Sequence, residues 1–226
     1  MLRTIEPVGL ARNLEKRLER LADGLSAAVF RGRMQPVDLA NRLIRQADLL
    51  ITEGPAGPGI PNVFDVAVSE SDIDPSSDVD RLADELSYTL TETATSRGWR
   101  TGGPVAVRLT VDRSVGRGSI RCTATPVPAP LPAWGELVEH RGSRSFALGD
   151  NRVVIGRSSD ADVTIDELEI SRLHAVVFRE GDRLWVTDLG SANGTLVNGM
   201  TVTEPTEIGS GDMLSLGPTT FALRVA

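Results

Sequence analysis

The segment RVVIGRSS, residues 152–159, passes from an apolar run through a glycine into a polar loop. Four segments downstream share this texture, because they are rich in Val, Leu, Ile, Phe and Thr and are bounded by Gly, Asn, Asp or Ser: residues 174–178, 184–187, 213–216 and 220–225. None of them has a helical period. Short apolar runs separated by turn residues are typical of β-sandwiches and barrels. The sequence therefore predicts that residues 136–226 form an all-β domain.

A proline-rich segment, PVPAPLP at residues 126–132, precedes this β-rich part. Proline fixes φ and lacks a backbone donor, so this segment can be neither a helix nor a central strand. We expect residues 126–135 to form a short, stiff, extended linker. The predicted domain order is thus residues 1–125, the linker, and residues 136–226.

Residues 1–125 have mainly helical patterns. Leucines at positions 10, 14, 18, 21 and 25 recur every three or four residues, and a second apolar stripe runs from Pro36 to Leu50. Both patterns predict amphipathic helices. A third helix is expected to open at Asp74-Pro75 and to end near Gly98.

Three strands are predicted in the same part of the chain. They are residues 63–69, 105–111 and 119–125, of which the last two are expected to pair as a hairpin, and residues 54–59 (GPAGPG) are expected to be a loop. The order helix, helix, strand, helix, strand, strand indicates a small α+β domain with a three-stranded sheet. The predicted fold class is therefore an α+β N-terminal domain followed by an all-β C-terminal sandwich.

Charge and residue counts exclude several kinds of site. Residues 1–128 have a net charge of −1 and residues 129–226 a net charge of −6, so neither part has the basic footprint of a nucleic-acid binder. Cys122 is the only cysteine, and His140 and His174 are the only histidines. We therefore expect no disulfide framework, no metal site and no cofactor. With no apolar run of ~20 residues and no secretory signal at the N-terminus, the sequence predicts a cytoplasmic protein.

Three predicted loops of the β-rich part carry an unusual set of polar residues, which comprises Gly156 and Arg157, then Ser171, Arg172 and His174, then Asn193 and Gly194. This succession of Gly-Arg, Ser-x-x-His and Asn-Gly resembles the forkhead-associated (FHA) family. The resemblance covers residues 136–226 and implies a β-sandwich that binds phosphothreonine in partner proteins. A phosphoryl group has three acceptor oxygens and almost two negative charges, which requires clustered donors.

The resemblance implies a role for each residue of the phosphopeptide site. Arg157 is expected to point its guanidinium at the phosphate, and the Ser171 hydroxyl to donate to a second phosphate oxygen. Arg172 is expected to add a further cation. Asn193 is expected to bond the peptide backbone beside the phosphorylated residue.

Other positions are expected to support or tune this site. The resemblance implies that His174 is buried and holds the loop backbone in shape, with Gly156 and Gly194 as further structural supports. Ala192 stands where many FHA domains have a Ser or Thr that helps to bind phosphate, so one polar contact is missing. Glu169 lies in a loop that reads peptide residues after the phosphothreonine, and its carboxylate is expected to disfavour acidic side chains there.

Taken singly, these residues have plainer interpretations. Arg157 alone would be a surface arginine paired with Asp160 or Asp162. Asn193-Gly194 alone would be a turn, and we interpret Asn198-Gly199 as a turn.

The N-terminal part has a resemblance of its own. The segment FRGRMQPVDLA, residues 30–40, and the order of an α+β domain before an FHA domain are similar to FhaA-type actinobacterial proteins. The linker here is much shorter than the long low-complexity linker that such proteins often have. The resemblance implies a cytoplasmic adaptor downstream of Ser/Thr kinases, in cell-wall synthesis and division. Its expected partner is a phosphorylated kinase or a phosphorylated cytoplasmic segment of a membrane protein.

Competing functions are a structural scaffold with a degenerate FHA pocket, and an N-terminal KH-like nucleic-acid binder fused to an FHA module. The near-neutral charge of the N-terminal part and its lack of a Gly-x-x-Gly loop between basic helices disfavour the nucleic-acid binder. An enzyme is disfavoured because no His or Cys nucleophile pair is available. We expect a non-catalytic adaptor that neither binds nucleic acid nor inserts into membranes.

Overall fold

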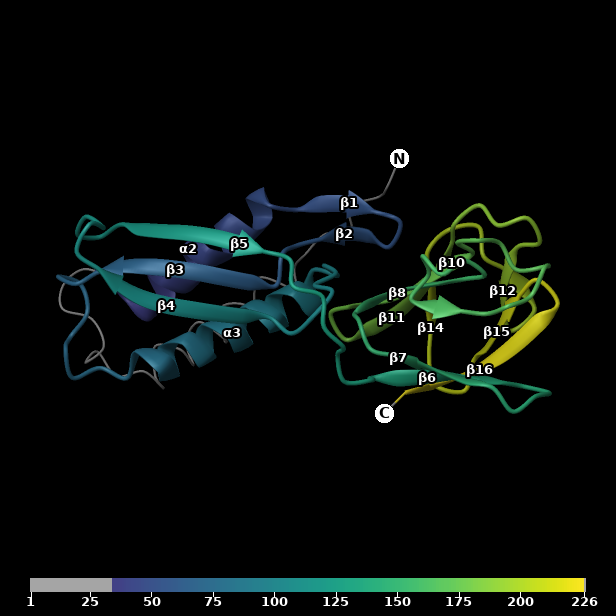
Figure 1. Ribbon diagram of the computed structural model, residues 1–226. Helices are drawn as coiled ribbons and strands as arrows, with labels where there is room; N and C mark the ends of the chain where they lie inside the picture. The colour runs from purple at the N-terminus through teal and green to yellow at the C-terminus, as the bar shows by residue number, and fades with distance from the viewer. Residues whose placement is uncertain (1–33, 226) are drawn as a thin grey trace. The chain divides into compact units, whose positions relative to one another are not determined.

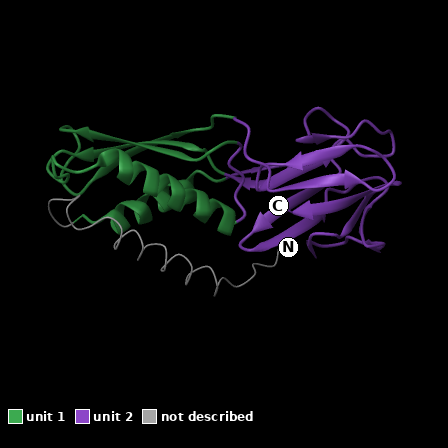
Figure 2. Ribbon diagram, turned by 90° about the horizontal axis from the view of Figure 1, so that it is seen from below, with its two compact units in different colours: residues 1–51, 60–97, 103–128 green, residues 52–59, 98–102, 129–226 purple. Residues whose placement is uncertain are grey.

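The computed structural model describes residues 34–225 of the chain (Figure 1). These residues form two compact units (Figure 2). The α+β unit contains residues 34–51, 60–97 and 103–128, and the sandwich unit contains residues 52–59, 98–102 and 129–225. Two short segments of the N-terminal part therefore belong to the sandwich unit. The helix predicted over residues 10–25 lies outside the described residues.

Helix α2, Pro36–Leu49, begins where the sequence predicts. Pro36 occupies the first helical turn, where its missing N–H costs nothing, and Asp38 accepts a hydrogen bond from the backbone N–H of Gln35 at 3.0 Å. The apolar stripe forms the buried face of the helix, which includes Leu39, Leu43 and Ala47. The predicted second helix is thus confirmed.

Helix α3, Val79–Ser96, begins later than predicted. The Asp74-Pro75 pair does not open it, because the carboxylate of Asp74 accepts the backbone N–H of Ser76 in a separate turn. The N-cap is Asp78, whose side chain accepts from the backbone N–H of Arg81 at 2.9 Å. The helix ends just before Gly98, as expected, and this glycine has a positive φ of 63°.

The three predicted strands are β3 (Val63–Ser69), β4 (Ala106–Asp112) and β5 (Ile120–Thr125), but the predicted pairing of the last two is wrong. The sheet order is β4-β3-β5, with β3 parallel to β4 and antiparallel to β5 (Figure 1). Helix α3 is the crossover that makes β4 parallel to β3. Strand β3 takes the centre because all but one of its residues are buried, whereas β4 and β5 are more exposed.

Residues 52–59 form a tight hairpin rather than the predicted loop. Strand β1 (Thr52–Gly54) pairs antiparallel with β2 (Gly57–Gly59). The two residues between the strands and the positive φ of Gly57, 97°, give the turn that closes this hairpin. Its prolines and glycines therefore mark a turn within paired strands.

Two sheets form the sandwich proper. The five-stranded sheet has the order β14-β11-β10-β8-β9, with bounds Thr206–Ile208, Arg183–Asp188, Ala175–Glu180, Arg152–Gly156 and Val163–Thr164. The six-stranded sheet has the order β13-β12-β15-β16-β6-β7, with bounds Met200–Thr201, Thr195–Val197, Met213–Leu216, Thr219–Val225, Gly135–Glu139 and Ser145–Leu148. Neighbouring strands are antiparallel except β8 and β9. The predicted all-β sandwich is confirmed.

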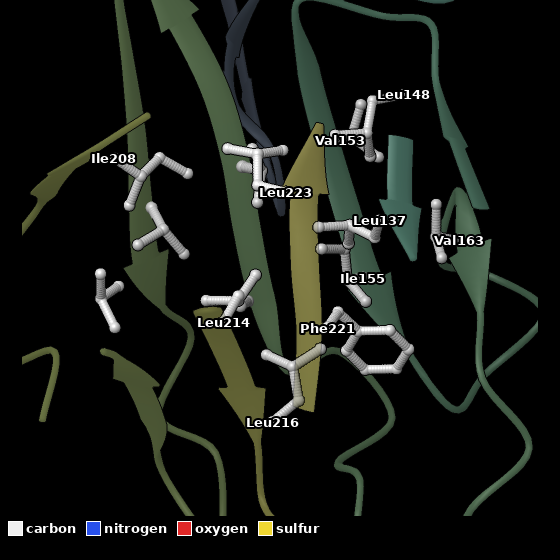
Figure 3. Close-up of a cluster of buried hydrophobic side chains, with 14 of the residues drawn as sticks. Leu137, Leu148, Val153, Ile155, Val163, Ile208, Leu214, Leu216, Phe221 and Leu223 are labelled. Carbon is white, nitrogen blue, oxygen red and sulfur yellow. The ribbon is translucent and has the colours of Figure 1, made fainter. Parts of the chain in front are cut away.

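The hydrophobic core lies between the two sheets (Figure 3). Ile155 of β8, Leu137 of β6 and Phe221 of β16 have no exposed surface and meet there. Val154, one residue before Ile155, points to the opposite face of its sheet and belongs to a second apolar cluster with Ala56. Strand β8 is therefore buried on both faces, which explains why its sequence shows an apolar run instead of alternation.

Candidate functional site

The loops before and after β9 lie against each other. The backbone N–H of Arg157 donates to the carbonyl of Ser171 at 2.9 Å, and the N–H of Ser158 donates to the carbonyl of Arg172 at 3.0 Å. Two successive residues of the β8–β9 loop (157–162) are thus bonded to two successive residues of the β9–β10 loop (165–174). This pairing brings the predicted arginines and serine together.

The β11–β12 loop, residues 189–194, contacts the same β9–β10 loop. The N–H of Ala192 donates to Ser171 Oγ at 2.9 Å, and Asn193 Nδ2 donates to the carbonyl of Glu169 at 2.8 Å. The Ser171 hydroxyl keeps its proton for another acceptor, because it accepts in this bond. Asn193 Oδ1 has no partner within residues 34–225.

A hollow of about 520 Å³ opens between the β8–β9 and β9–β10 loops. It is lined by Arg157, Ser158, Asp160, Ser171, Arg172 and Leu173. Arg157 and Arg172 are exposed, and neither forms an ion pair within the described residues. The plainer interpretation of Arg157 fails, because Asp160 and Asp162 have other partners. The hollow therefore presents two guanidinium groups together with one carboxylate, that of Asp160, which is bonded to Ser158 Oγ.

A hydrogen bond to the β9–β10 loop orients the guanidinium of Arg157. Its Nε donates to the carbonyl of Ile170 at 3.1 Å, which leaves the two terminal nitrogens to face another acceptor. Guanidinium donors form a planar fork that suits phosphate and carboxylate oxygens.

His174 is completely buried between the loops. Its Nδ1 accepts the backbone N–H of Ser171, and its Nε2 lies 3.1 Å from the carbonyl oxygen of Gly194. Because a carbonyl oxygen can only accept, the ring proton is on Nε2 and the imidazole is neutral. One side chain thus bonds both the β9–β10 and the β11–β12 loops.

Two glycines permit these close approaches. A Cβ at position 156 would collide with the carbonyl of Arg172, so only Gly156 lets the end of β8 meet the β9–β10 loop. Gly194 has a φ of 75°, which other residues rarely adopt, and its carbonyl faces His174.

Asp188 is a support that the sequence interpretation missed. Its carboxylate accepts the backbone N–H groups of Gly190 and Ser191, each at 2.8 Å, and the hydroxyls of Ser191 and Thr195 at 2.6 and 2.7 Å. Burial alone would raise the pKa of Asp188, but the bonds from Ser191, Thr195 and Gly190 outweigh it and lower the pKa. The signal was present as Asp-x-Gly-Ser, which is typical of a turn closed by an aspartate side chain.

The remaining predicted positions lie at the edge of this arrangement. Glu169 is exposed, and its carboxylate forms no ion pair within residues 34–225. Ala192 is exposed as well. Asn198 has a φ of 51° in the turn between β12 and β13, which confirms the interpretation of Asn198-Gly199 as a turn.

Metal-ligand clusters and membrane-spanning helices are two further features to consider in the described part of the chain. No group of three or more His, Cys, Asp or Glu side chains there could hold a metal ion. Of the two helices over residues 34–225, neither is long and apolar enough to cross a membrane.

Comparison with known proteins gives matches to both parts of the chain. Residues 11–123 match the family described as FhaA, N-terminal domain, and residues 153–217 match the FHA domain. Over 79 residues, 34% of this chain, the sequence is 39% identical to an oxoglutarate dehydrogenase inhibitor of Corynebacterium jeikeium, and spans about half (51%) of that relative. It is 33% identical over 108 residues to the inhibitor of the same name from Corynebacterium diphtheriae, covering 45% of this chain and 72% of that relative. It is also 32% identical over 82 residues to the FHA domain-containing protein FhaA of Mycobacterium tuberculosis, covering 36% of this chain and 15% of that protein.

Proposed function

The chain belongs to the FhaA N-terminal domain family, whose match covers half of its 226 residues, and from this premise we propose that it is a non-catalytic adaptor that binds phosphothreonine. The observation that carries the proposal is the hollow between the β8–β9 and β9–β10 loops. It presents the guanidinium groups of Arg157 and Arg172, neither of which forms an ion pair within residues 34–225, beside the hydroxyl of Ser171 and the carboxylate of Asp160. The FHA domain match over residues 153–217 includes all three.

In the proposed complex, Arg157 and Arg172 supply positive charge and Ser171 donates its free proton to a phosphate oxygen. Bonds to a charged acceptor contribute about 1.5–3 kcal/mol each, and we expect a micromolar affinity, about −8 kcal/mol, once the cost of ordering the peptide is subtracted. The Oδ1 atom of Asn193 accepts a backbone N–H of the peptide, while its Nδ2 holds the β9–β10 loop. Glu169 disfavours acidic residues after the phosphothreonine.

A titration of the full chain tests this function directly. We expect micromolar binding of a phosphothreonine peptide taken from an oriented peptide library, and no measurable binding of the same peptide without phosphate. Arg157→Ala should abolish binding while the protein stays folded, because this side chain is exposed and the substitution removes only its bond to the carbonyl of Ile170 from the fold. A matched control is Arg183→Ala, which removes the same charge from an exposed ion pair with Glu207. Equal binding of the two peptides would reject the proposal and favour a scaffold with a degenerate pocket.

The partner we propose is a phosphorylated Ser/Thr kinase or a phosphorylated cytoplasmic segment of a membrane protein, in cell-wall or cell-division signalling. The support is membership of the FhaA family together with an acidic unit that has cations concentrated at one hollow. A pull-down from an actinobacterial extract, before and after phosphatase treatment, tests it. The partner should be retained by the wild-type chain, lost with Arg157→Ala, and lost after dephosphorylation.

A further inference from the structure

A distant segment of the sandwich unit holds the β8–β9 loop. Arg100 donates from Nη1 and Nη2 to the two carboxylate oxygens of Asp162, both at 2.6 Å. The same Nη1 donates to the carbonyl of Arg152 at 2.9 Å. Paired guanidinium–carboxylate bonds fix orientation as well as distance. One side chain therefore fastens the last residue of the loop to the strand that leads into it.

Asp162 has a second hydrogen-bond partner. Its Oδ2 also accepts the backbone N–H of Val154 at 2.8 Å. The side chains of Arg100 and Asp162 are only 29% and 30% exposed, so solvent screens this pair less than a pair at the open surface. Next to it, Ala161 is buried in the apolar cluster that contains Ala56. The C-terminal half of the loop is thus fixed at several points.

The N-terminal half of the same loop faces the phosphate site. Arg157, Ser158 and Asp160 line the hollow. Within the loop, the N–H of Ala161 donates to the carbonyl of Ser158 at 3.0 Å. This bond connects the half of the loop that Arg100 and Asp162 hold to the half that lines the hollow.

The charge of Asp162 matters as well as its position. Without Arg100, this carboxylate would be an unpaired anion in the loop that carries Arg157. The remaining bond, from the backbone N–H of Val154 to Asp162 Oδ2, would have to hold the carboxylate alone.

We propose that Arg100 is a positioning residue for phosphopeptide binding, which acts through Asp162 to hold the β8–β9 loop and Arg157 in place. This inference rests on the proposed function. Arg100 does not line the hollow and need not touch the peptide. It comes from the segment 98–102, so the competent site includes a residue that a fragment starting at the proline-rich linker would lack.

The test uses the full chain and the phosphothreonine peptide defined above. Arg100→Ala is expected to weaken binding about five- to twentyfold. Arg183→Ala removes the same charge from a different ion pair of the same unit and is expected to change affinity less than twofold. Arg100→Lys keeps the charge but cannot form the paired bonds, so its affinity should lie between those of the wild type and Arg100→Ala.

A spectroscopic readout separates positioning from general loss of stability. In ¹H–¹⁵N spectra, Arg100→Ala should shift the Arg157 side-chain Nε–H signal and the amides of residues 157–161, while the amides of residues 189–195 stay in place. If Arg100→Ala does not fold, Asp162→Asn serves instead, because the amide oxygen can still accept from Val154 but the ion pair is lost. The same loss of affinity is expected.

The outcomes distinguish the two proposals. Wild-type affinity in folded Arg100→Ala or Asp162→Asn, with binding still abolished by Arg157→Ala, would overturn the positioning role alone. Wild-type affinity in Arg157→Ala would overturn the proposed function itself. An equal loss of affinity in Arg100→Ala and Arg183→Ala would mean that net charge, not the loop, is responsible.

Discussion

The β8–β9 loop and the β11–β12 loop both contact Ser171, but different parts of the chain hold them. The β11–β12 loop is fixed by Asp188, the residue directly before it, which accepts four hydrogen bonds from residues 190–195. The β8–β9 loop, besides its bonds to the β9–β10 loop, is bonded at Asp162 to Arg100, a residue 62 positions earlier. The β11–β12 loop therefore has a support that is close in sequence, and the β8–β9 loop has one that is distant. Only the close one can be recognised from the neighbouring sequence.

The largest expected effect comes from the residue that bonds two of the three loops. His174→Ala leaves the backbone N–H of Ser171 without its acceptor, whereas the carbonyl of Gly194 keeps its bond from the N–H of Gly217. An unsatisfied donor costs about 1–3 kcal/mol, and the cavity left by the buried imidazole adds to that, so the free energy of unfolding should fall by at least this amount. Peptide affinity should fall with it, because Ser171 loses its support.

Thermal denaturation and peptide titration of the same samples check this prediction. His140→Ala is the matched control, since His140 is the other histidine and is exposed. An unchanged melting temperature in His174→Ala would show that the imidazole does not support these loops.

Asp188→Asn tests the local support by itself. The substitution removes the charge that accepts bonds from Ser191 and Thr195, and we expect a loss of about 1.5–3 kcal/mol at neutral pH. Spectra should show shifted amides in residues 189–195 and an undisturbed β8–β9 loop, which is the reverse of the pattern expected for Arg100→Ala.

The stability difference between the wild type and Asp188→Asn should depend on pH, and the sign of this dependence can be predicted. The pKa of Asp188 is lowered in the folded protein, so its charge stabilises the fold at pH values above its unfolded pKa of about 3.9. That contribution is lost as the pH falls through the lowered folded pKa. Melting temperatures of wild type and Asp188→Asn should therefore converge in acid, and a gap that widens below about pH 4 would contradict the assignment.

Ala192→Thr tests the contribution of the β11–β12 loop to binding by adding a hydroxyl group to it. Ala192 is exposed beside Ser171, and a threonine hydroxyl there could donate to the phosphate. One hydrogen bond of ordinary strength tightens binding by about 0.5–1.5 kcal/mol, which is roughly two- to twelvefold. Ala192→Val is the control of similar shape without the hydroxyl. Weaker or unchanged binding by the threonine variant would place this loop away from the phosphate.

The smallest effect concerns the space between the β9–β10 and β11–β12 loops. We expect a preference for phosphothreonine over phosphoserine, because the threonine methyl can be buried near Leu173 or Ala192. Burying one methyl contributes about 0.8 kcal/mol, roughly a fourfold preference. Two peptides that differ only in this methyl, titrated at the same salt concentration, provide the measurement. Affinities within a factor of two would mean that the site recognises the phosphate charge alone.

Much of the fold could be predicted because its elements have strong local patterns. The stripe from Pro36 to Leu50 and the apolar strand 63–69 appear in the structure as α2 and β3. The five strands predicted in the C-terminal part match β8, β10, β11, β15 and β16. Strands of two or three residues, such as β9 and β13, were missed because so few residues show no period, and the longer β6 and β7 were missed as well.

Pairing and long-range contacts could not be predicted from local sequence. The pattern of β4 and β5 says nothing about which strand separates them, so an expected hairpin proved to be two edges of one sheet. The hairpin over residues 52–59 was hidden by prolines and glycines that also signal loops. At the site, the predicted loops do meet, but Arg100 is a surface arginine in any local interpretation, and only the folded chain places it on Asp162.

The most direct test of the three-loop site maps the phosphothreonine peptide on the full chain by ¹H–¹⁵N spectroscopy. Saturating peptide is expected to shift the amides of residues 156–158, 170–173 and 192–194 and the side-chain signals of Arg157 and Asn193. The unphosphorylated peptide at the same concentration should shift none of them. Peptide-induced shifts confined to other surfaces, or equal shifts with both peptides, would contradict the claim that these three loops form a phosphothreonine site.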